Sequence, residues 1–432
     1  MSFDFAPTRP QKIAIVGGGI SGLAAAWLLA PSHRVTLFEA EPRLGGHART
    51  VIAGKRGDQP VDTGFIVFNY ATYPHLTRMF HELGVPVAKS DMSFGATIDG
   101  GRVEYGLRDL SALSGQRANL LRPGFLRMLR DIFRFNSGAE AAAREGQSIG
   151  ELMDALRLGP WFERYYLLPL CGAIWSTPPA RIRDYPALAL LAFFRNHALL
   201  SASGQHQWWT VDGGSVEYVR RLEAHLAATG ATLRRGAPVA SVTRHPGRGI
   251  SLRPVGGEAE HYDQVILACH SDQALALLTD PSEAERQALS AVRYQDNHAV
   301  LHADEGQMPR RRTCWSSWVY QSEGAAEQPR IGVTYWMNRL QNIPQDDPLF
   351  VSLNPVRPVR QEAIYDEVTY RHPVFDAGAL AAQQRLKAMQ GERGTFYAGA
   401  WMRHGFHEDG FASAVRVAEA MAPQLAPQMA LA

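Results

Sequence analysis

The feature that most constrains the fold of this chain is a glycine-rich turn that follows a short apolar run. The run at residues 13–16 is too short for a buried helix and ends at glycine, which favours a parallel β-strand. Gly17, Gly19 and Gly22 follow at G-x-G-x-x-G spacing, where glycines permit a tight turn, close approach of a pyrophosphate and helix–sheet packing. We therefore expect a helix to begin here with its N-terminus facing phosphate groups.

A second strand and an acidic residue complete the pattern. Pro31 ends the helical segment, and residues 35–38 form a second apolar run that leads to Glu39. This acid lies about 20 residues past the glycines, where the ribose of a dinucleotide needs a hydrogen-bond acceptor. A carboxylate at that position disfavours the 2′-phosphate of NADP. The order of these elements predicts a Rossmann-like α/β domain rather than a chance glycine turn.

Length and composition limit the class of protein. The 432 residues suffice for two domains, and 44 Lys and Arg against 42 Asp and Glu leave the chain nearly neutral, which argues against nucleic-acid binding. Cys171, Cys269 and Cys314 have no metal-site spacing and cannot all pair, so we expect a reducing compartment and no metal. With no apolar signal segment and no run of the roughly 18 apolar residues that span a bilayer, we expect a cytoplasmic protein, free or peripheral on the inner face of the membrane.

The segment after Glu39 carries a second glycine pair. Glu39 and Ala40, followed by Gly45 and Gly46, resemble the flavoprotein superfamily of amine oxidases and phytoene desaturases, in which this pair lets the backbone wrap the pyrophosphate and ribityl chain of FAD. The resemblance implies FAD as the cofactor. No cysteine lies in residues 395–411, so the common cysteinyl flavin link at this end is unavailable and we expect noncovalent FAD.

The same resemblance implies a glutathione-reductase-type, Rossmann-like FAD-binding domain with an interleaved α+β substrate domain. The composition of the chain agrees with such an interleaving. Residues 85–204 are rich in Leu, Arg and Phe at helical spacing, and the segments on either side differ from them in composition. We predict an FAD-binding domain from residues 1–70, 205–275 and 385–432, and a substrate domain from residues 71–204 and 276–384.

Four further segments are implied to contact the cofactor. They are 62–65 beside the isoalloxazine ring, the segment around Val239 at the adenine, Ala268 near the dinucleotide, and the N-terminus of a last helix from about Gly410 at the flavin pyrimidine. An ordinary turn is the alternative interpretation of 62–65. The predicted cofactor-binding residues are Gly17, Gly19, Ile20, Ser21, Gly22, Glu39, Ala40, Arg43, Gly45, Gly46, His47, Asp62, Thr63, Gly64, Phe65, Val239, Ala268, Gly399, Asp409, Gly410 and Phe411.

Several segments resemble one bacterial group more closely. VDTGFIVFN, SDMSF, TYWMNRLQ, HPVFD and GFHEDG, spread from Val61 to Gly410, are similar to FAD-binding oxidoreductases encoded beside cyclopropane-fatty-acid-synthase-like methyltransferases. That group is similar to a methylated-fatty-acid desaturase of furan fatty acid formation. The resemblance implies hydride transfer to flavin N5 from a methyl-branched fatty acyl chain, as phospholipid, and a lipid methyltransferase as partner.

Three alternatives stay open. A flavin amine oxidase commonly places a lysine near flavin N5, but residues 290–340 contain no lysine. A flavin-dependent reductase of a methylene-branched acyl chain would use NAD(P)H, but no second G-x-G-x-x-G unit is visible. A non-catalytic, FAD-stabilised lipid-binding partner of a methyltransferase is the third.

The closing segment supplies the candidate groups for proton transfer. His404, His407 and Glu408 are the titratable side chains that we expect nearest the ring, and we predict that His407 or Glu408 accepts or positions a proton. The alternative is that they only order the loop and contact FAD. Ala400 stands where the family usually has an acid, so we expect Asp409 or Glu408 to make that contact instead.

A basic amphipathic helix is predicted over residues 123–135. Its apolar face carries Phe125, Leu126, Leu129, Ile132 and Phe133, with Arg127, Arg130 and Arg134 opposite. Such a helix can lie in a lipid headgroup interface. The alternative is a surface helix with its apolar face on the core and its arginines in water.

Overall fold

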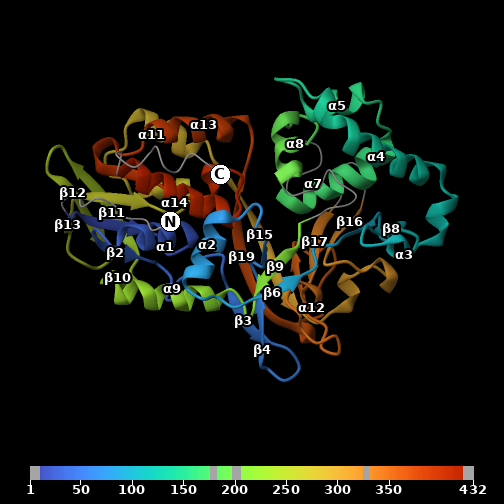
Figure 1. The fold of residues 1–432 in the computed structure, drawn as a ribbon, viewed down its shortest axis with the longest axis horizontal. Coiled ribbons are helices and arrows are strands. Elements are labelled where there is room, and N and C mark those ends of the chain that lie inside the picture. Colours follow the sequence, from blue (N-terminus) through green and yellow to red (C-terminus); the bar gives the residue numbers. More distant parts are fainter. Residues whose placement is uncertain (1–9, 176–181, 197–205, 325–329, 422–432) are drawn as a thin grey trace.

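The computed structural model describes residues 10–175, 182–196, 206–324 and 330–421. Two large sheets lie in adjacent parts of the molecule, each covered by helices, and the chain passes between them several times (Figure 1). Each part is therefore assembled from stretches that are distant in sequence.

The first sheet is parallel and has the strand order β10-β2-β1-β14-β20. Its strands are β1 (Lys12–Val16), β2 (Arg34–Phe38), β10 (Thr232–Arg234), β14 (Gln264–Leu267) and β20 (Thr395–Tyr397). β1 is central, with Ile15 paired to Leu37 on one side and to Ile266 on the other. This sheet confirms the predicted α/β, Rossmann-like fold class.

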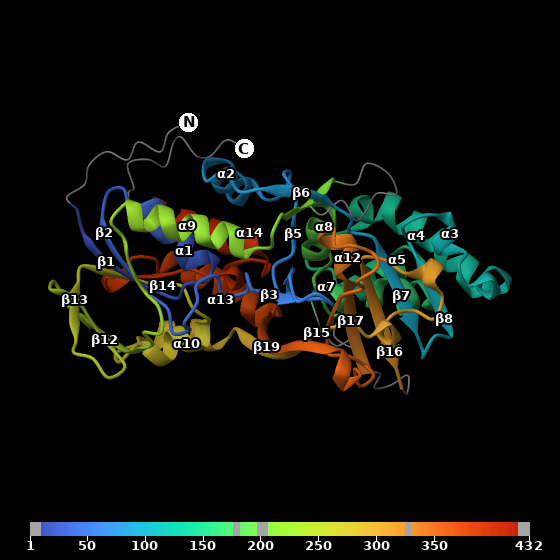
Figure 2. The ribbon, with the colours of Figure 1, turned by 90° about the horizontal axis from the view of Figure 1, so that it is seen from below.

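Both faces of this sheet are covered, which explains why β1 is apolar throughout. Ile13 and Ile15 face helices α1 (Ile20–Leu29), α9 (Val216–Ala228) and α14 (His407–Met421). Ala14 and Val16 face the opposite layer, seen below the sheet in Figure 2. That layer consists of β11 (Val239–His245), β12 (Gly249–Pro254), β13 (Glu260–Tyr262), α10 (Ser271–Leu277), α11 (Glu283–Ser290) and α13 (Ala377–Ala388). The sequence of a strand that is buried on both faces is a continuous run of apolar residues.

The second sheet has seven strands in the order β19-β15-β18-β17-β16-β7-β8. It is antiparallel except for β16 and β7, which run parallel. Its strands are β7 (Phe94–Ile98), β8 (Val103–Gly106), β15 (Arg293–His302), β16 (Trp318–Glu323), β17 (Arg330–Trp336), β18 (Phe350–Leu353) and β19 (Ile364–Val374).

A helical layer packs on the β7 to β17 part of this sheet through one apolar core. Its helices are α3 (Leu110–Leu113), α4 (Pro123–Ala142), α5 (Ile149–Ala155), α6 (Pro160–Phe162), α7 (Leu168–Trp175) and α8 (Ala187–Asn196). The predicted helix over 123–135 is the first part of α4. The structure divides its predicted apolar face: Phe125 is buried together with Met128 and Phe135, whereas Leu126 and Phe133 are exposed.

Short elements connect the two parts. The hairpin of β3 (Thr50–Ala53) and β4 (Gln59–Asp62) and the small sheet of β5 (Val67–Phe68), β6 (Val87–Ser90) and β9 (Trp208–Val211) lie between them. Helix α2 (Pro74–Glu82) packs in the core on the parallel sheet, and α12 (Met337–Leu340) packs beside β17 and β18. Single 3₁₀ or π turns are Arg117–Leu121, Glu163–Leu167, Glu305–Gln307, Arg312–Cys314, Gln361–Ala363, Glu392–Gly394 and Ala400–Met402.

The predicted domain boundaries stay a prediction. Helices α11 and α13 pack in the core on the parallel sheet, although that division gives their residues to the substrate domain, and α2 packs against α14 in the same part of the molecule. In the ranges that the structure describes, no helix combines the length and apolar character needed to cross a bilayer.

Candidate functional site

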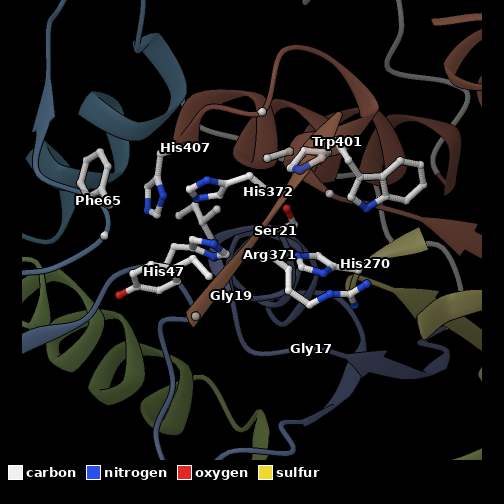
Figure 3. A pocket seen from close by; sticks show the side chains of 18 of the residues that line it. Gly17, Gly19, Ser21, His47, Phe65, His270, Arg371, His372, Trp401 and His407 are labelled. Carbon is white, nitrogen blue, oxygen red and sulfur yellow. The ribbon is translucent and has the colours of Figure 1, made fainter. Parts of the chain in front are cut away.

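A cavity of about 820 Å³ extends from the glycine turn after β1 to the seven-stranded sheet. Figure 3 shows part of its lining, with Gly17, Gly19 and Ser21 beside a group of aromatic and imidazole rings. The predicted cofactor residues that line it are Gly17, Gly19, Ile20, Ser21, Glu39, Ala40, Gly46, His47, Thr63, Gly64, Phe65, Val239, Ala268 and Gly399.

The turn after β1 requires glycine because the Cβ of any other residue would collide with neighbouring backbone atoms. Gly17 has φ +112°, and a Cβ on it would lie 2.7 Å from the Ala268 carbonyl oxygen. A Cβ on Gly22 would collide with the Gly17 carbonyl oxygen, so Gly22 serves helix–sheet packing and does not line the cavity. Gly19 is the N-cap of α1, and the backbone N–H groups of that helix start are therefore at the cavity wall.

Glu39 and the second glycine pair are tied to this turn. The Glu39 carboxylate accepts hydrogen bonds from the Gly18 N–H at 2.6 Å and the Glu41 N–H at 2.8 Å. Gly45 donates its N–H to the Gly18 carbonyl at 2.8 Å. The Arg43 guanidinium donates to the Gly46 carbonyl at 2.9 Å, so Arg43 and Gly45 stabilise the turn from outside and are not among the cavity-lining residues.

Asp62 has a different place from the one predicted beside the flavin ring. Its carboxylate is fully buried, accepts from the Ser215 N–H at 2.9 Å and from the Thr50 hydroxyl at 2.6 Å, and does not line the cavity. Burial raises the pKa of Asp62 to about 6 in spite of these hydrogen bonds. Asp62 therefore holds the β3–β4 hairpin to the start of α9, while its neighbours Thr63, Gly64 and Phe65 reach the cavity.

The first turn of α14 also lies behind the cavity wall. Glu408, Asp409, Gly410 and Phe411 are buried and are not among its lining residues. Asp409 accepts from the Phe406 N–H at 3.0 Å, and a Cβ on Gly410 would lie 2.7 Å from the Ile20 side chain. These residues pack α14 on α1 and position the loop before it.

Glu408 caps another helix. Its carboxylate oxygens accept the N–H groups of His75 and Leu76, each at 3.0 Å, in the first turn of α2. Burial raises the pKa of Glu408 to about 7. The geometry thus joins α14 to α2 through this carboxyl group, so that of the predicted pair His407 and Glu408 only His407 reaches the cavity, where His404 also lies.

His407 is held in place on two sides. Its ring stacks on Phe65, with ring centroids 3.9 Å apart, and its Nε2 lies 2.7 Å from the Tyr218 hydroxyl. Burial lowers the pKa of His407 to about 3 and raises that of Tyr218, so at neutral pH the imidazole is neutral and the phenol keeps its proton. A neutral imidazole has one donor and one acceptor nitrogen, and the Nε2 contact to the hydroxyl can form with either partner as donor.

Four further histidines line the cavity, of which sequence reasoning had singled out His47 and His404 and had missed His270 and His372. His47 stacks between Tyr370 and His372, with centroids 4.8 and 5.6 Å away, and His270 stacks on Tyr294 at 4.3 Å. Figure 3 shows the rings of His47, His270 and His372 around one space together with His407. Burial lowers the pKa of His47 to about 3 and those of His270 and His372 to about 4. The alternation of Tyr370 and His372 on one face of β19 was the available signal for this missed group.

The end of the cavity toward the seven-stranded sheet is apolar. We call it the apolar end, and it is formed by Met92, Trp318, Tyr335, Leu340, Val351 and Leu353. Among the described residues that line the whole cavity, the only carboxylates are Glu39 and Glu41, at the glycine turn, and no lysine is present. The site therefore offers polar backbone at one end and an uncharged surface at the other.

These features fit an adenine dinucleotide with an attached ring system. The open backbone at Gly17 and Gly19 and the start of α1 can accept a pyrophosphate, and the Glu39 carboxylate can accept ribose hydroxyls. A ring would extend toward Thr63, Phe65 and the histidines, between the two sheets.

Comparisons with known proteins agree with this assignment. Residues 20–307 match the family described as "Flavin containing amine oxidoreductase". Hydroxyneurosporene desaturase of Rubrivivax gelatinosus is 24% identical over 322 residues, which is 66% of this chain and 59% of the relative. Human protoporphyrinogen oxidase is 26% identical over 324 residues, 65% of each protein. The chain thus spans less than two thirds of the length of these curated relatives.

Solved structures show the same fold at lower identity. A putative protoporphyrinogen oxidase from an Exiguobacterium species has a TM-score of 0.70 and 19% identity, covering 97% of this chain and all of that one. Cyclohexylamine oxidase from Brevibacterium oxydans has a TM-score of 0.68 and 15% identity, covering 96% of this chain and all of that one. A fatty acid isomerase from P. acnes has a TM-score of 0.65 and 16% identity, covering 97% and 100%. At these identities the likeness establishes the fold.

Proposed function

Because the chain belongs to the flavin-containing amine oxidoreductase family and FAD is its cofactor, we propose that it is an FAD-dependent oxidoreductase that desaturates a methyl-branched fatty acyl chain, carried in a phospholipid. The proposal has two parts: the reaction class, which follows from the family, and the substrate class, which rests on the sequence resemblance and the apolar end of the cavity. A lipid methyltransferase that supplies the branch is the proposed functional partner.

The apolar end is the observation that carries the substrate class. Its aliphatic and aromatic side chains offer no charge to an ammonium or carboxylate group, and a hydrocarbon chain gains free energy by leaving water there. Desaturation removes a hydride from one carbon and a proton from its neighbour, and bound FAD supplies the two-electron acceptor. The first curated relative is also a desaturase by name.

The residues of this chain then have separate tasks. The glycine turn, Glu39 and the start of α1 bind the dinucleotide, while Phe65 and His407 bound the space where the ring system and the substrate meet. His407 is neutral and is held by Tyr218 through Nε2, which leaves Nδ1 as the ring nitrogen that does not face the Tyr218 hydroxyl. We propose that Nε2–H donates to the Tyr218 hydroxyl oxygen and that Nδ1 accepts the proton that the substrate loses, while bound FAD would accept the hydride.

Amine oxidation is the main rival, and the structure gives it no specific support. Among the described residues no lysine lines the cavity, and the carboxylates that do line it are at the opposite end from the seven-stranded sheet.

The test is to mix the flavin-loaded protein anaerobically with a phospholipid that carries a methyl-branched acyl chain. We expect loss of the oxidised-flavin colour and a product two hydrogens lighter, with a straight-chain phospholipid of equal length as the control. Cells with and without the protein should show the same mass difference in their branched lipids. Bleaching by simple amines but not by the branched lipid would contradict the substrate class, and colourless protein that takes up no flavin would contradict the reaction class.

A further inference from the structure

The most unusual surface of the molecule lies on the helical layer, away from the cavity. Of the large apolar side chains that are exposed in the described part of the chain, more than half lie between residues 107 and 133. They are Leu107, Leu110, Leu120, Leu121, Leu126 and Phe133, and Leu110, Leu121 and Phe133 are 82%, 86% and 65% exposed. Exposed apolar groups gathered in this way mark an interaction surface.

The same stretch concentrates the positive charge of the protein. Between residues 107 and 134 the sequence has six arginines, two aspartates, no lysine and no glutamate, a net charge of +4 compared with +2 for the whole chain. Asp131 is buried under α4, where it accepts the Gly159 N–H at 2.9 Å, so Asp109 is the exposed acid of this stretch. The arginines are Arg108, Arg117, Arg122, Arg127, Arg130 and Arg134.

Most of these arginines are not neutralised by the protein. Ion pairs join Arg108 to Asp109 and Arg130 to Asp131. In the described residues the other four make no ion pair, and Arg122 and Arg134 donate to backbone carbonyls instead. Arginines elsewhere, such as Arg244 with Glu285, are commonly paired with carboxylates.

The apolar and basic groups share one end of the molecule. Leu126 and Phe133 are seven residues apart on α4 and lie on the same exposed stripe, with Arg130 between them and Arg127 and Arg134 beside it. Figures 1 and 2 both place α3 and α4 together at the end farthest from the parallel sheet. Leu121 is in the turn immediately before α4.

We propose that this surface, the α3–α4 end, docks on a bilayer that contains anionic phospholipid. The protruding Leu and Phe side chains enter the boundary of the acyl region, and the guanidinium groups bind lipid phosphates, for which their planar, bidentate geometry is suited. Charge complementarity selects the anionic lipid, since the stretch is basic and nearly free of exposed acids. The inference rests on the surface alone and does not depend on the reaction assigned to the cavity.

The experiment is co-sedimentation of the flavin-loaded full chain with vesicles of phosphatidylcholine, with and without phosphatidylglycerol. We expect binding to the mixed vesicles and much weaker binding to phosphatidylcholine alone. Two variants divide the surface into its parts: Leu121→Ser with Phe133→Ser removes apolar groups, and Arg117→Gln with Arg127→Gln removes charge. Each should lower partitioning by about tenfold or more.

Matched controls are available outside the α3–α4 end. Ile52→Ser with Val255→Ser changes two side chains that are 59% and 61% exposed, and Arg248→Gln with Arg253→Gln removes the same charge. We expect both to bind like wild type, and the flavin absorbance and melting temperature to be unchanged in all four proteins. Wild type left in the supernatant with anionic vesicles, or equal losses in surface and control variants, would overturn the proposal. Wild-type vesicle binding by the serine variant together with competition by heparin would overturn it in favour of general polyanion binding.

Discussion

At the scale of single residues, the site is defined by side chains that burial keeps uncharged. His407 and Tyr218 face each other at hydrogen-bond distance inside the protein, and the loss of water around them lowers the pKa of the imidazole and raises that of the phenol. Neither group then titrates near neutral pH. Their hydrogen bond therefore holds the imidazole in one orientation and engages Nε2, so that Nδ1 is the nitrogen left for proton transfer.

Removing this hydrogen bond should slow flavin reduction without weakening substrate binding. For Tyr218→Phe, which keeps the ring and loses the hydroxyl, we expect a kcat about fivefold lower at unchanged KM, because one neutral hydrogen bond is worth about 1 kcal/mol. His407→Phe keeps the stack on Phe65 and should lower kcat about a hundredfold. Stopped-flow flavin reduction measures both. If flavin-replete His407→Phe reduced its flavin at the wild-type rate, His407 would have no role in proton transfer.

The buried histidines should make the stability of the flavin-free protein depend on pH. In the unfolded chain a histidine has its ordinary pKa of about 6.5, whereas burial lowers the pKa of His47 to about 3. Below about pH 6.5 the unfolded state binds more protons, so this histidine lowers the free energy of unfolding by about 1.4 kcal/mol for each further pH unit.

His47→Phe removes that contribution while keeping a ring for the stack on Tyr370. Relative to wild type, the variant should gain stability as the pH falls from about 7 to about 5 in denaturant titrations. Glu408 has a raised pKa and acts in the opposite direction, but it is present in both proteins and cancels in the difference. Parallel pH profiles for the two proteins would contradict the burial argument.

At the scale of elements, α14 is attached to its surroundings by groups that the sequence suggested as cofactor contacts. Glu408 joins it to the N–H groups of α2, and Gly410 permits its close approach to α1. The sequence predicted a last helix from about Gly410, and the structure has it from His407. The sequence could not distinguish a carboxylate that caps a neighbouring helix from one that faces a ligand, because both need an acid at the same position.

Glu408→Ala should therefore lower the free energy of unfolding and leave the rate of flavin reduction unchanged. Loss of the cap leaves two buried N–H groups in α2 without an acceptor, for which we expect a loss of about 1–2 kcal/mol in the free energy of unfolding. Flavin reduction per bound FAD should stay at the wild-type rate. Glu283→Ala, at an exposed position in the first turn of α11, is the control and should change stability by less than about 0.5 kcal/mol. A slower flavin reduction in Glu408→Ala at full flavin occupancy would show that Glu408 takes part in the reaction.

At the scale of the whole molecule, the sequence predicted what depends on local patterns and missed what depends on distant contacts. The strand before Gly17, the glycine turn and Glu39 follow from periodicity and turn chemistry within a short stretch. The His372 side of the cavity comes from β19 in the seven-stranded sheet, and the Asp62 hydrogen bond to Ser215 joins residues far apart in sequence. No local pattern contains the contact between Asp62 and Ser215. The alternation of Tyr370 and His372 marks one face of a strand, but it does not show that this face meets the glycine turn.

The interleaved topology makes a prediction about refolding. β1 pairs with β14 and β14 pairs with β20, so the parallel sheet closes only after segments more than two hundred residues apart have met. Pairings of such long range are slow to form. In pulse-labelled hydrogen exchange during refolding, we expect the amides of β1 and β20 to become protected together, in the slow phase. Early protection of β1 alone would contradict this order.

The placement of β20 also matters during synthesis. When a ribosome has released β1, β2 and α1, β1 still presents an unpaired edge that β14 will cover, and β14 will in turn present an edge until β20 pairs with it. An exposed edge of this kind pairs readily with other chains. We therefore expect overproduction to yield some insoluble, flavin-free material, and co-production of a chaperone to increase the soluble, flavin-loaded fraction.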